Sequence, residues 1–148
     1  MAIAWAPDLE DVADYVTSRT VDSSTPGSDE PLGTFSPDTY PTDIQVGRLI
    51  AGATQWVVNV TGDIVESLRD TAKDVAAMRA AALVEISYPV RDDDIEVANT
   101  LLEQARAARD ELVAANRSAG GPGVSGTAAP VGSFPDARAW VGDHPAWP

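Results

Sequence analysis

The stretch VAAMRAAALVEISY at residues 75–88 decides the fold of this chain. It is apolar on nearly every face of a helix, which is typical of a helix surrounded by protein on all sides. Its many alanines require the neighbouring helices to approach it closely. Pro89 stops this helix, and Asp63 with Glu66 predicts a capping box at its beginning. The sequence therefore predicts an all-α fold, a small four-helix bundle whose central helix spans residues 63–88.

The helix that precedes the central one carries signals at both ends. Thr42 and Gln45 predict a capping box, apolar residues recur along one stripe, and Gly62 ends the pattern. These signals predict a helix over residues 42–61. Trp56 falls beside the apolar stripe, so we expect it at the edge of the core, with a subunit interface as the alternative.

Two more helices complete the predicted body, residues 1–116. Over residues 93–116, apolar side chains recur at spacings of three and four, and we expect Asp93 and Glu96 to cap this helix. Near the N-terminus, acidic residues open a shorter helical pattern over residues 7–19, where the positive end of the helix dipole favours them. The body thus contains four predicted helices.

A long loop separates the first two helices at residues 20–41. Closely spaced prolines and glycines exclude a helix there, and a hairpin is one conformation open to it. Loops of about 20 residues are uncommon in compact domains and are often functional. We therefore treat this loop as a candidate contact element, with Leu32, Phe35 and Tyr40 as its large apolar side chains.

The charge of the chain is strongly one-sided, with 23 acidic and 10 basic residues and a formal net charge of −13. Such a field repels phosphate backbones and anionic lipid headgroups, so we expect no direct nucleic-acid ligand and no membrane association. No stretch reaches the ~18 apolar residues of a membrane span. The first residues lack the basic and apolar regions of a secretory signal, so we expect a soluble, cytoplasmic product.

Side chains suited to catalysis or metal binding are scarce. The chain has no cysteine and a single histidine, His144, without a second imidazole to share a metal. Asp92, Asp93 and Asp94 are adjacent and lack the glycine and final glutamate of a calcium loop, so helix capping explains them better. No phosphate-binding glycine loop or nucleophile elbow occurs. We predict no enzyme activity, no cofactor and no metal site.

The C-terminal tail, residues 117–148, differs in composition from the acidic body. Two arginines balance two aspartates in it, so its formal charge is zero. A Gly/Ser/Ala linker leads to apolar side chains interrupted by proline, which predicts an extended segment. Docking on a partner and covering its own bundle are both open to the tail, and we favour docking. The docking side chains would be Val131, Phe134, Trp140, Val141 and Trp147.

Four short stretches carry a likeness to a known family: SRTVD at 18–22, LGTF at 32–35, YPT at 40–42 and MRAAALVEISYP at 78–89. Together with the acidic first helix and the Pro/Gly/aromatic tail, they resemble the head-to-tail adaptor proteins of long-tailed phages that infect actinobacteria. These adaptors are also called head-completion or connector proteins. One lysine against nine arginines fits the GC-rich genome of such a phage.

The resemblance implies a structural protein of the virion neck that is assembled in the bacterial host cytoplasm. About twelve copies would form a ring beneath the portal, with the C-terminal tail docking on the portal protein. The opposite face would receive a stopper or tail-completion protein, and the loop at 20–41 would face neighbouring subunits or the tail side. DNA would pass through the channel without specific binding, since acidic walls repel it.

A second hypothesis assigns this chain to the cellular protein-binding modules. A cellular helical module, regulatory or antitoxin-like, would capture one partner through the same C-terminal tail. The two hypotheses differ in stoichiometry, because a connector forms a ring and a module forms a one-to-one complex.

Overall fold

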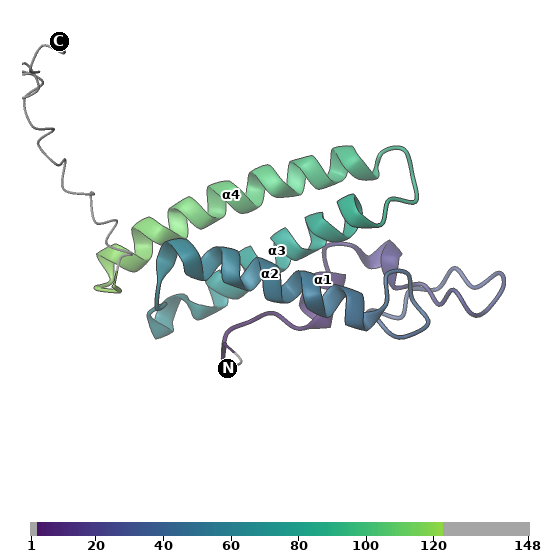
Figure 1. Ribbon diagram of the computed structural model, residues 1–148, viewed down its shortest axis with the longest axis horizontal. Coiled ribbons are helices and arrows are strands. Elements are labelled where there is room, and N and C mark those ends of the chain that lie inside the picture. Colours follow the sequence, from purple (N-terminus) through teal and green to yellow (C-terminus); the bar gives the residue numbers. More distant parts are fainter. Residues whose placement is uncertain (1–2, 123–148) are drawn as a thin grey trace, which may run out of the picture.

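The structure, a computed structural model, describes residues 3–122 of the chain. This part forms the small all-α bundle that the sequence predicts. Its three long helices lie side by side, and a short first helix lies against them (Figure 1). The helices are α1, Leu9–Ala13; α2, Asp43–Thr61; α3, Arg69–Ser87; and α4, Asp94–Ser118.

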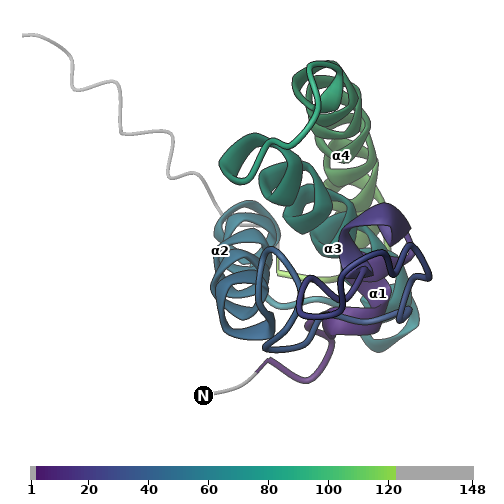
Figure 2. The same ribbon diagram turned by 90° about the vertical axis from the view of Figure 1, so that its right-hand side faces the viewer.

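The alanine-rich α3 is the centre of the bundle, as predicted. It contacts α1, α2 and α4, and Figure 2 shows it between α2 and α4 with α1 on another side. Its residues Ala80, Ala81 and Ala82 are fully buried. The core has two clusters, one beside α1 and the loop and one towards the connection between α2 and α3. Small side chains on α3 therefore allow three helices to pack around it.

Helix α2 begins and ends where the sequence predicts. The Gln45 amide donates to the Thr42 hydroxyl at 3.4 Å, and the Thr42 amide donates to the Gln45 side chain at 2.9 Å. Gly62 follows the last turn with φ of 64°, a left-handed conformation that glycine adopts without strain. Trp56 is half-buried against the second core cluster, at the edge of the core.

The predicted beginning of α3 is wrong, because α3 starts at Arg69 after a short 3-10 turn at Glu66–Leu68. The segment before it is extended, and Ile64 enters the core. The buried Asn116 side chain holds this connection: its amide nitrogen donates to the carbonyls of Thr61 (3.3 Å) and Asp63 (3.0 Å). Its oxygen accepts from the Val65 amide at 3.0 Å. A partner on α4 thus replaces the capping box predicted within α3.

The first helix is also shorter than the predicted span of residues 7–19. Asp8 and Asp11 form a capping box, but α1 ends at Ala13. The chain then tightens into a 3-10 turn at Thr17–Thr20, after Val16 with φ of −135°. Val16 and Arg19 are both buried, so the chain leaves the α-helix and still places these two side chains inward.

Helix α4 lies close to its predicted span of residues 93–116, but its cap differs. Asp93 occupies the N-cap position without a side-chain cap hydrogen bond. Asp94 instead accepts from the backbone amides of Val90 and Arg91, each at 2.7 Å. The capping box of Asp93 and Glu96 is therefore not formed. At its other end α4 continues to Ser118, so the helical body extends past residue 116.

The loop at 20–41 is pinched like a hairpin and extends from one end of the bundle (Figure 1). An antiparallel bridge joins Val21 to Pro31, and the Leu32 amide donates to the Thr20 carbonyl at 3.0 Å. Its far half returns into the protein, where Phe35 is only 3% exposed and belongs to the first core cluster. The loop is thus anchored at its base and along its return.

Candidate protein-binding surface

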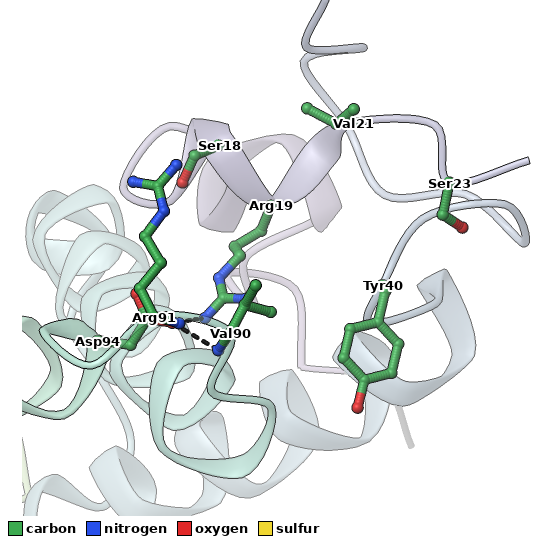
Figure 3. A pocket seen from close by; sticks show the side chains of 8 residues that line it. All are labelled: Ser18, Arg19, Val21, Ser23, Tyr40, Val90, Arg91 and Asp94. Carbon is green, nitrogen blue, oxygen red and sulfur yellow. Dashed lines mark hydrogen bonds and ion pairs between the residues drawn. The ribbon is translucent and has the colours of Figure 1, made fainter. Parts of the chain in front are cut away.

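The end of the bundle that carries the loop also contains a cavity of about 300 Å³. The cavity lies where the loop meets the connection between α3 and α4 (Figure 3). Its lining combines aliphatic, hydroxyl and charged side chains: Ser18, Arg19, Val21, Ser23, Tyr40, Val90, Arg91 and Asp94.

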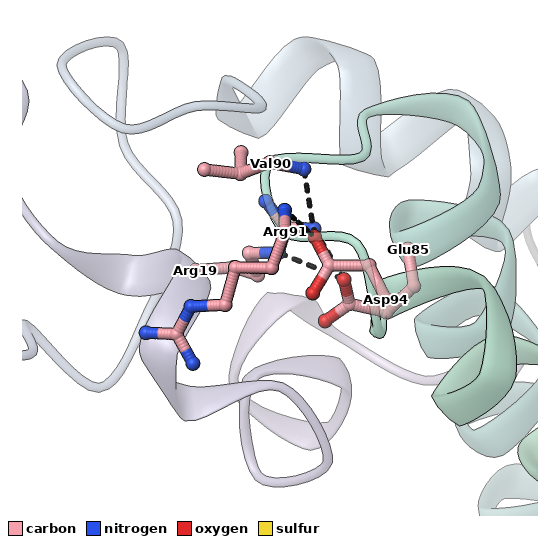
Figure 4. Close-up of polar contacts among 5 residues, drawn as sticks. All are labelled: Arg19, Glu85, Val90, Arg91 and Asp94. Atoms are coloured by element: carbon pink, nitrogen blue, oxygen red, sulfur yellow. Dashed lines mark hydrogen bonds and ion pairs between the residues drawn. The ribbon is translucent and has the colours of Figure 1, made fainter.

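A buried charged cluster of Arg19, Glu85 and Asp94 lies beneath this cavity (Figure 4). The Arg19 guanidinium donates to Glu85 through two nitrogens, with Nε at 2.9 Å from Oε2. It also reaches Asp94 Oδ2 at 2.7 Å. The side chains are 5%, 6% and 11% exposed, respectively, so the cluster lies largely out of water. It joins the 3-10 turn after α1 to both α3 and α4.

The electrostatics of this site favour the ionised forms of Asp94 and Arg19. Burial alone would raise the pKa of Asp94, but hydrogen bonds from the Arg91 and Val90 amides and the Arg19 charge outweigh it and lower the pKa. Burial would lower the pKa of Arg19, but its bonds to Glu85 and the two carboxylate charges raise it. One cation faces two carboxylates, so removing Arg19 would leave buried negative charge uncompensated.

Exposed apolar side chains surround this end of the bundle. Tyr40 is 54% exposed and stacks edge-on against Tyr88, with ring centroids 5.6 Å apart. Val90, beside the cavity, is 66% exposed, and Ile44 in the first turn of α2 is 67% exposed. Figure 1 shows the start of α2, the end of α3 and the start of α4 at the same end of the bundle. We call Tyr40, Ile44, Tyr88 and Val90 the apolar end.

The predicted contact residues of the loop fall into two groups. Leu32 is 51% exposed and Tyr40 is 54% exposed, so both can reach another molecule. Phe35 cannot, because its ring is buried among core residues of α1, α2 and α3. Its prediction as a surface contact is corrected: it anchors the loop. The predicted docking residues of the tail, Val131, Phe134, Trp140, Val141 and Trp147, lie outside the described residues.

The sequence does not predict the charged cluster, because Arg19 lies 66 positions from Glu85 and 75 positions from Asp94. One signal was present in the sequence. Glu85 is the single acidic residue in the apolar stretch 75–88, and a carboxylate on a buried helix needs a cationic partner. That signal predicts a buried ion pair, although it does not identify Arg19.

No helix within residues 3–122 is long and apolar enough to cross a membrane. In the same range, no group of three or more histidine or acidic side chains is arranged to hold a metal ion. Comparisons with protein-family models, with curated proteins and with solved structures found no match to this chain.

Proposed function

We propose that this chain is a structural subunit of a phage neck, forming a ring that joins the portal of the head to the tail or to the next connector protein. The observation that carries the proposal is the apolar end: Tyr40, Ile44 and Val90 are exposed at one end of a helical body, where Tyr88 lies half-buried against Tyr40. The resemblance of residues 18–22, 32–35, 40–42 and 78–89 to the head-to-tail adaptor proteins supports the same function. A connector works by holding neighbours, and such a surface suits that work.

The apolar end gains free energy when another protein covers it. Full burial of a large apolar side chain contributes about 1.5–3 kcal/mol, and Ile44 and Val90 still expose about two thirds of their surface. Covering both therefore contributes roughly 2–4 kcal/mol to an interface. The rim offers hydrogen-bonding groups as well, from Ser18, Ser23 and Arg91. This combination of an apolar centre and a polar margin is typical of protein interfaces.

The rest of the assembly follows from the proposal. The C-terminal tail docks on the portal protein, and the apolar end receives the stopper or tail-completion protein. The net charge of −13 keeps DNA moving through the ring without specific binding, because carboxylates and phosphates repel each other. The channel wall therefore carries more acidic than basic side chains.

Coexpression with the portal protein of the same phage tests the proposal. Native mass spectrometry and electron microscopy should find a ring of about twelve copies bound to the portal, and a one-to-one complex would refute it. The double variant Ile44→Asp/Val90→Asp should keep the portal complex but lose binding of the tail-side protein. Ala114→Asp, which places one new carboxylate at an exposed position near the far end of α4, should bind both partners normally.

A second function fits the same surface. A cellular helical module, regulatory or antitoxin-like, could bury the apolar end and its own tail against one partner. It would form a one-to-one complex, and no ring would appear with or without a portal protein.

A further inference from the structure

A cluster of arginines surrounds Trp56 on the side of the bundle where α2, α3 and α4 meet. The guanidinium of Arg79, from α3, lies 4.2 Å from the centre of the Trp56 ring, and that of Arg109, from α4, lies 4.3 Å from it. Arg106, one turn before Arg109, is exposed and contributes to the same positive field. We call Trp56, Arg79, Arg106 and Arg109 the arginine–tryptophan patch.

The positive charge of this patch is poorly compensated. Arg109 pairs with Asp110 at 3.1 Å, but the Asp110 side chain is 71% exposed, so this pair is weak. Arg79 and Arg106 form no ion pair with any residue in 3–122. Burial lowers the pKa of Arg79, and the charges of Arg106 and Arg109 lower it further. Like charges thus gather here, in a chain whose net charge is −13.

The geometry of the patch suits carboxylates. A guanidinium stacked on an aromatic ring presents its N–H groups at the edge of the plane, where a carboxylate can accept two hydrogen bonds. Trp56 also restricts the two stacked arginines, so less side-chain freedom is lost when a carboxylate binds. The patch therefore fits a segment that offers several carboxylates.

Such a segment extends from the end of this same chain's bundle. Residues 22–38, which we call the acidic loop, contain Asp22, Asp29, Glu30 and Asp38 and no lysine or arginine. Asp22 is used internally, since it accepts hydrogen bonds from Ser24 and Thr25. Asp29 and Glu30 are exposed and are in no ion pair within the described part of the chain. They stand next to Pro31, whose bridge to Val21 fixes the loop.

We propose that the arginine–tryptophan patch of one copy binds the acidic loop of a second copy, with Asp29 and Glu30 accepting hydrogen bonds from Arg79 and Arg106. The proposal rests on the proposed function, because it names the contact between neighbours in the ring. Patch and loop are different surfaces, so the contact is head-to-tail, and contacts of this kind close into rings when the rotation allows. The apolar end beside the loop stays free for the tail-side protein.

Phosphate groups of DNA are the competing ligand for three arginines. The acidic surface of the remaining body opposes a polyanion over its whole length, whereas a short acidic loop contacts only the patch. A segment of another copy is therefore the better fit.

Charge reversal in the full-length protein tests the contact. Arg106→Glu and Glu30→Arg should each weaken self-association at low salt by about tenfold or more, measured by sedimentation velocity, because like charges then face each other. The double variant should recover most of the loss, and added salt should weaken the wild-type contact. Arg48→Glu, the same charge change at an exposed position of α2 outside the patch, serves as the matched control. Circular dichroism checks that each variant folds.

Cysteine cross-linking provides a second readout, since the chain contains no cysteine. The variant Glu30→Cys/Arg106→Cys should form a ladder of cross-linked oligomers with a short bismaleimide reagent, because an Arg–Glu contact holds the two backbones too far apart for a direct disulfide; each single variant should stop at dimers. Absence of a ladder together with unchanged self-association of both reversal variants overturns the proposal. Retention of a short DNA duplex that Arg106→Glu abolishes would overturn it too, by assigning the patch to phosphates.

These outcomes also separate the inference from the proposed function. If a ring forms on the portal protein and both charge-reversal variants still assemble normally, the contact is wrong and the connector function stands. If the ladder forms but no ring appears with the portal protein, the contact stands and the connector function fails.

Discussion

Replacing Arg19 with methionine should destabilise the bundle strongly, since Arg19 is the only cation of the buried charged cluster. Asp94 keeps two hydrogen bonds from backbone amides after this change. Glu85, however, loses its only hydrogen-bond donor within residues 3–122, with a side chain only 6% exposed. Breaking a buried pair from one side costs about 3–5 kcal/mol, so we expect a loss of that size in the free energy of unfolding.

Urea denaturation followed by far-ultraviolet circular dichroism measures this loss. The double variant Arg19→Met/Glu85→Leu removes the unpaired carboxylate as well, and it should regain most of the stability, to within about 1–2 kcal/mol of wild type. Arg48→Met, a matched change at an exposed arginine, should alter stability by no more than about 0.5 kcal/mol. The reasoning is refuted if Arg19→Met loses less than about 1 kcal/mol, or if the double variant is no more stable than the single one.

Three further changes probe other parts of the fold. The pKa of Asp94 in the folded protein is lowered from its ordinary value of 3.8. The carboxylate should therefore stabilise the fold fully above about pH 3.8, and this contribution should disappear as the pH falls through the lowered pKa. Asp94→Asn should flatten this acidic part of a plot of urea midpoint against pH. Asn116→Ala should lose about 1–3 kcal/mol of unfolding free energy in urea titrations, because it leaves the Val65 amide unpaired; a loss below 0.5 kcal/mol would contradict this role. Phe35→Ala should lower stability by about 3–5 kcal/mol and Leu32→Ala by no more than about 0.5 kcal/mol in thermal melts, and equal losses would show that Phe35 is not an anchor.

Local signals in the sequence predict those parts of the fold that short-range contacts determine. The capping box of Thr42 and Gln45 and the positive-φ Gly62 define both ends of α2, and each involves residues within four positions of one another. The apolar composition of residues 75–88 is likewise enough to predict that protein surrounds α3 on all sides. Helix existence and the central place of α3 were therefore accessible from the sequence.

The predictions that were wrong concern segments held by residues far away in the sequence. The start of α3 depends on Asn116, whose bond to Val65 spans 51 positions, so the nearby Asp63 and Glu66 gave a misleading local signal. At the start of α4, Asp94 accepts from the Val90 and Arg91 amides and also binds Arg19 from 75 positions away, whereas Asp93 makes no cap hydrogen bond. Contacts between side chains so far apart in the sequence cannot be predicted from local residue spacing.

The candidate binding surfaces also combine features that the sequence predicts with features that it does not. Loop composition marks residues 20–41 as unusual, and Leu32 and Tyr40 are exposed there. Composition does not distinguish Phe35, which the return of the loop carries into the core. The stacking of Arg79 on Trp56 joins two helices and has no counterpart in the sequence pattern.

The alanines of α3 have a consequence for how the protein responds to temperature. An alanine loses no side-chain rotamer freedom on burial, and it exposes little hydrocarbon when the chain unfolds. The heat capacity of unfolding grows with the apolar area exposed. A bundle built around Ala72, Ala76, Ala77, Ala80 and Ala81 therefore has a small heat-capacity change for its length, and its stability varies only gently between a cold and a warm environment.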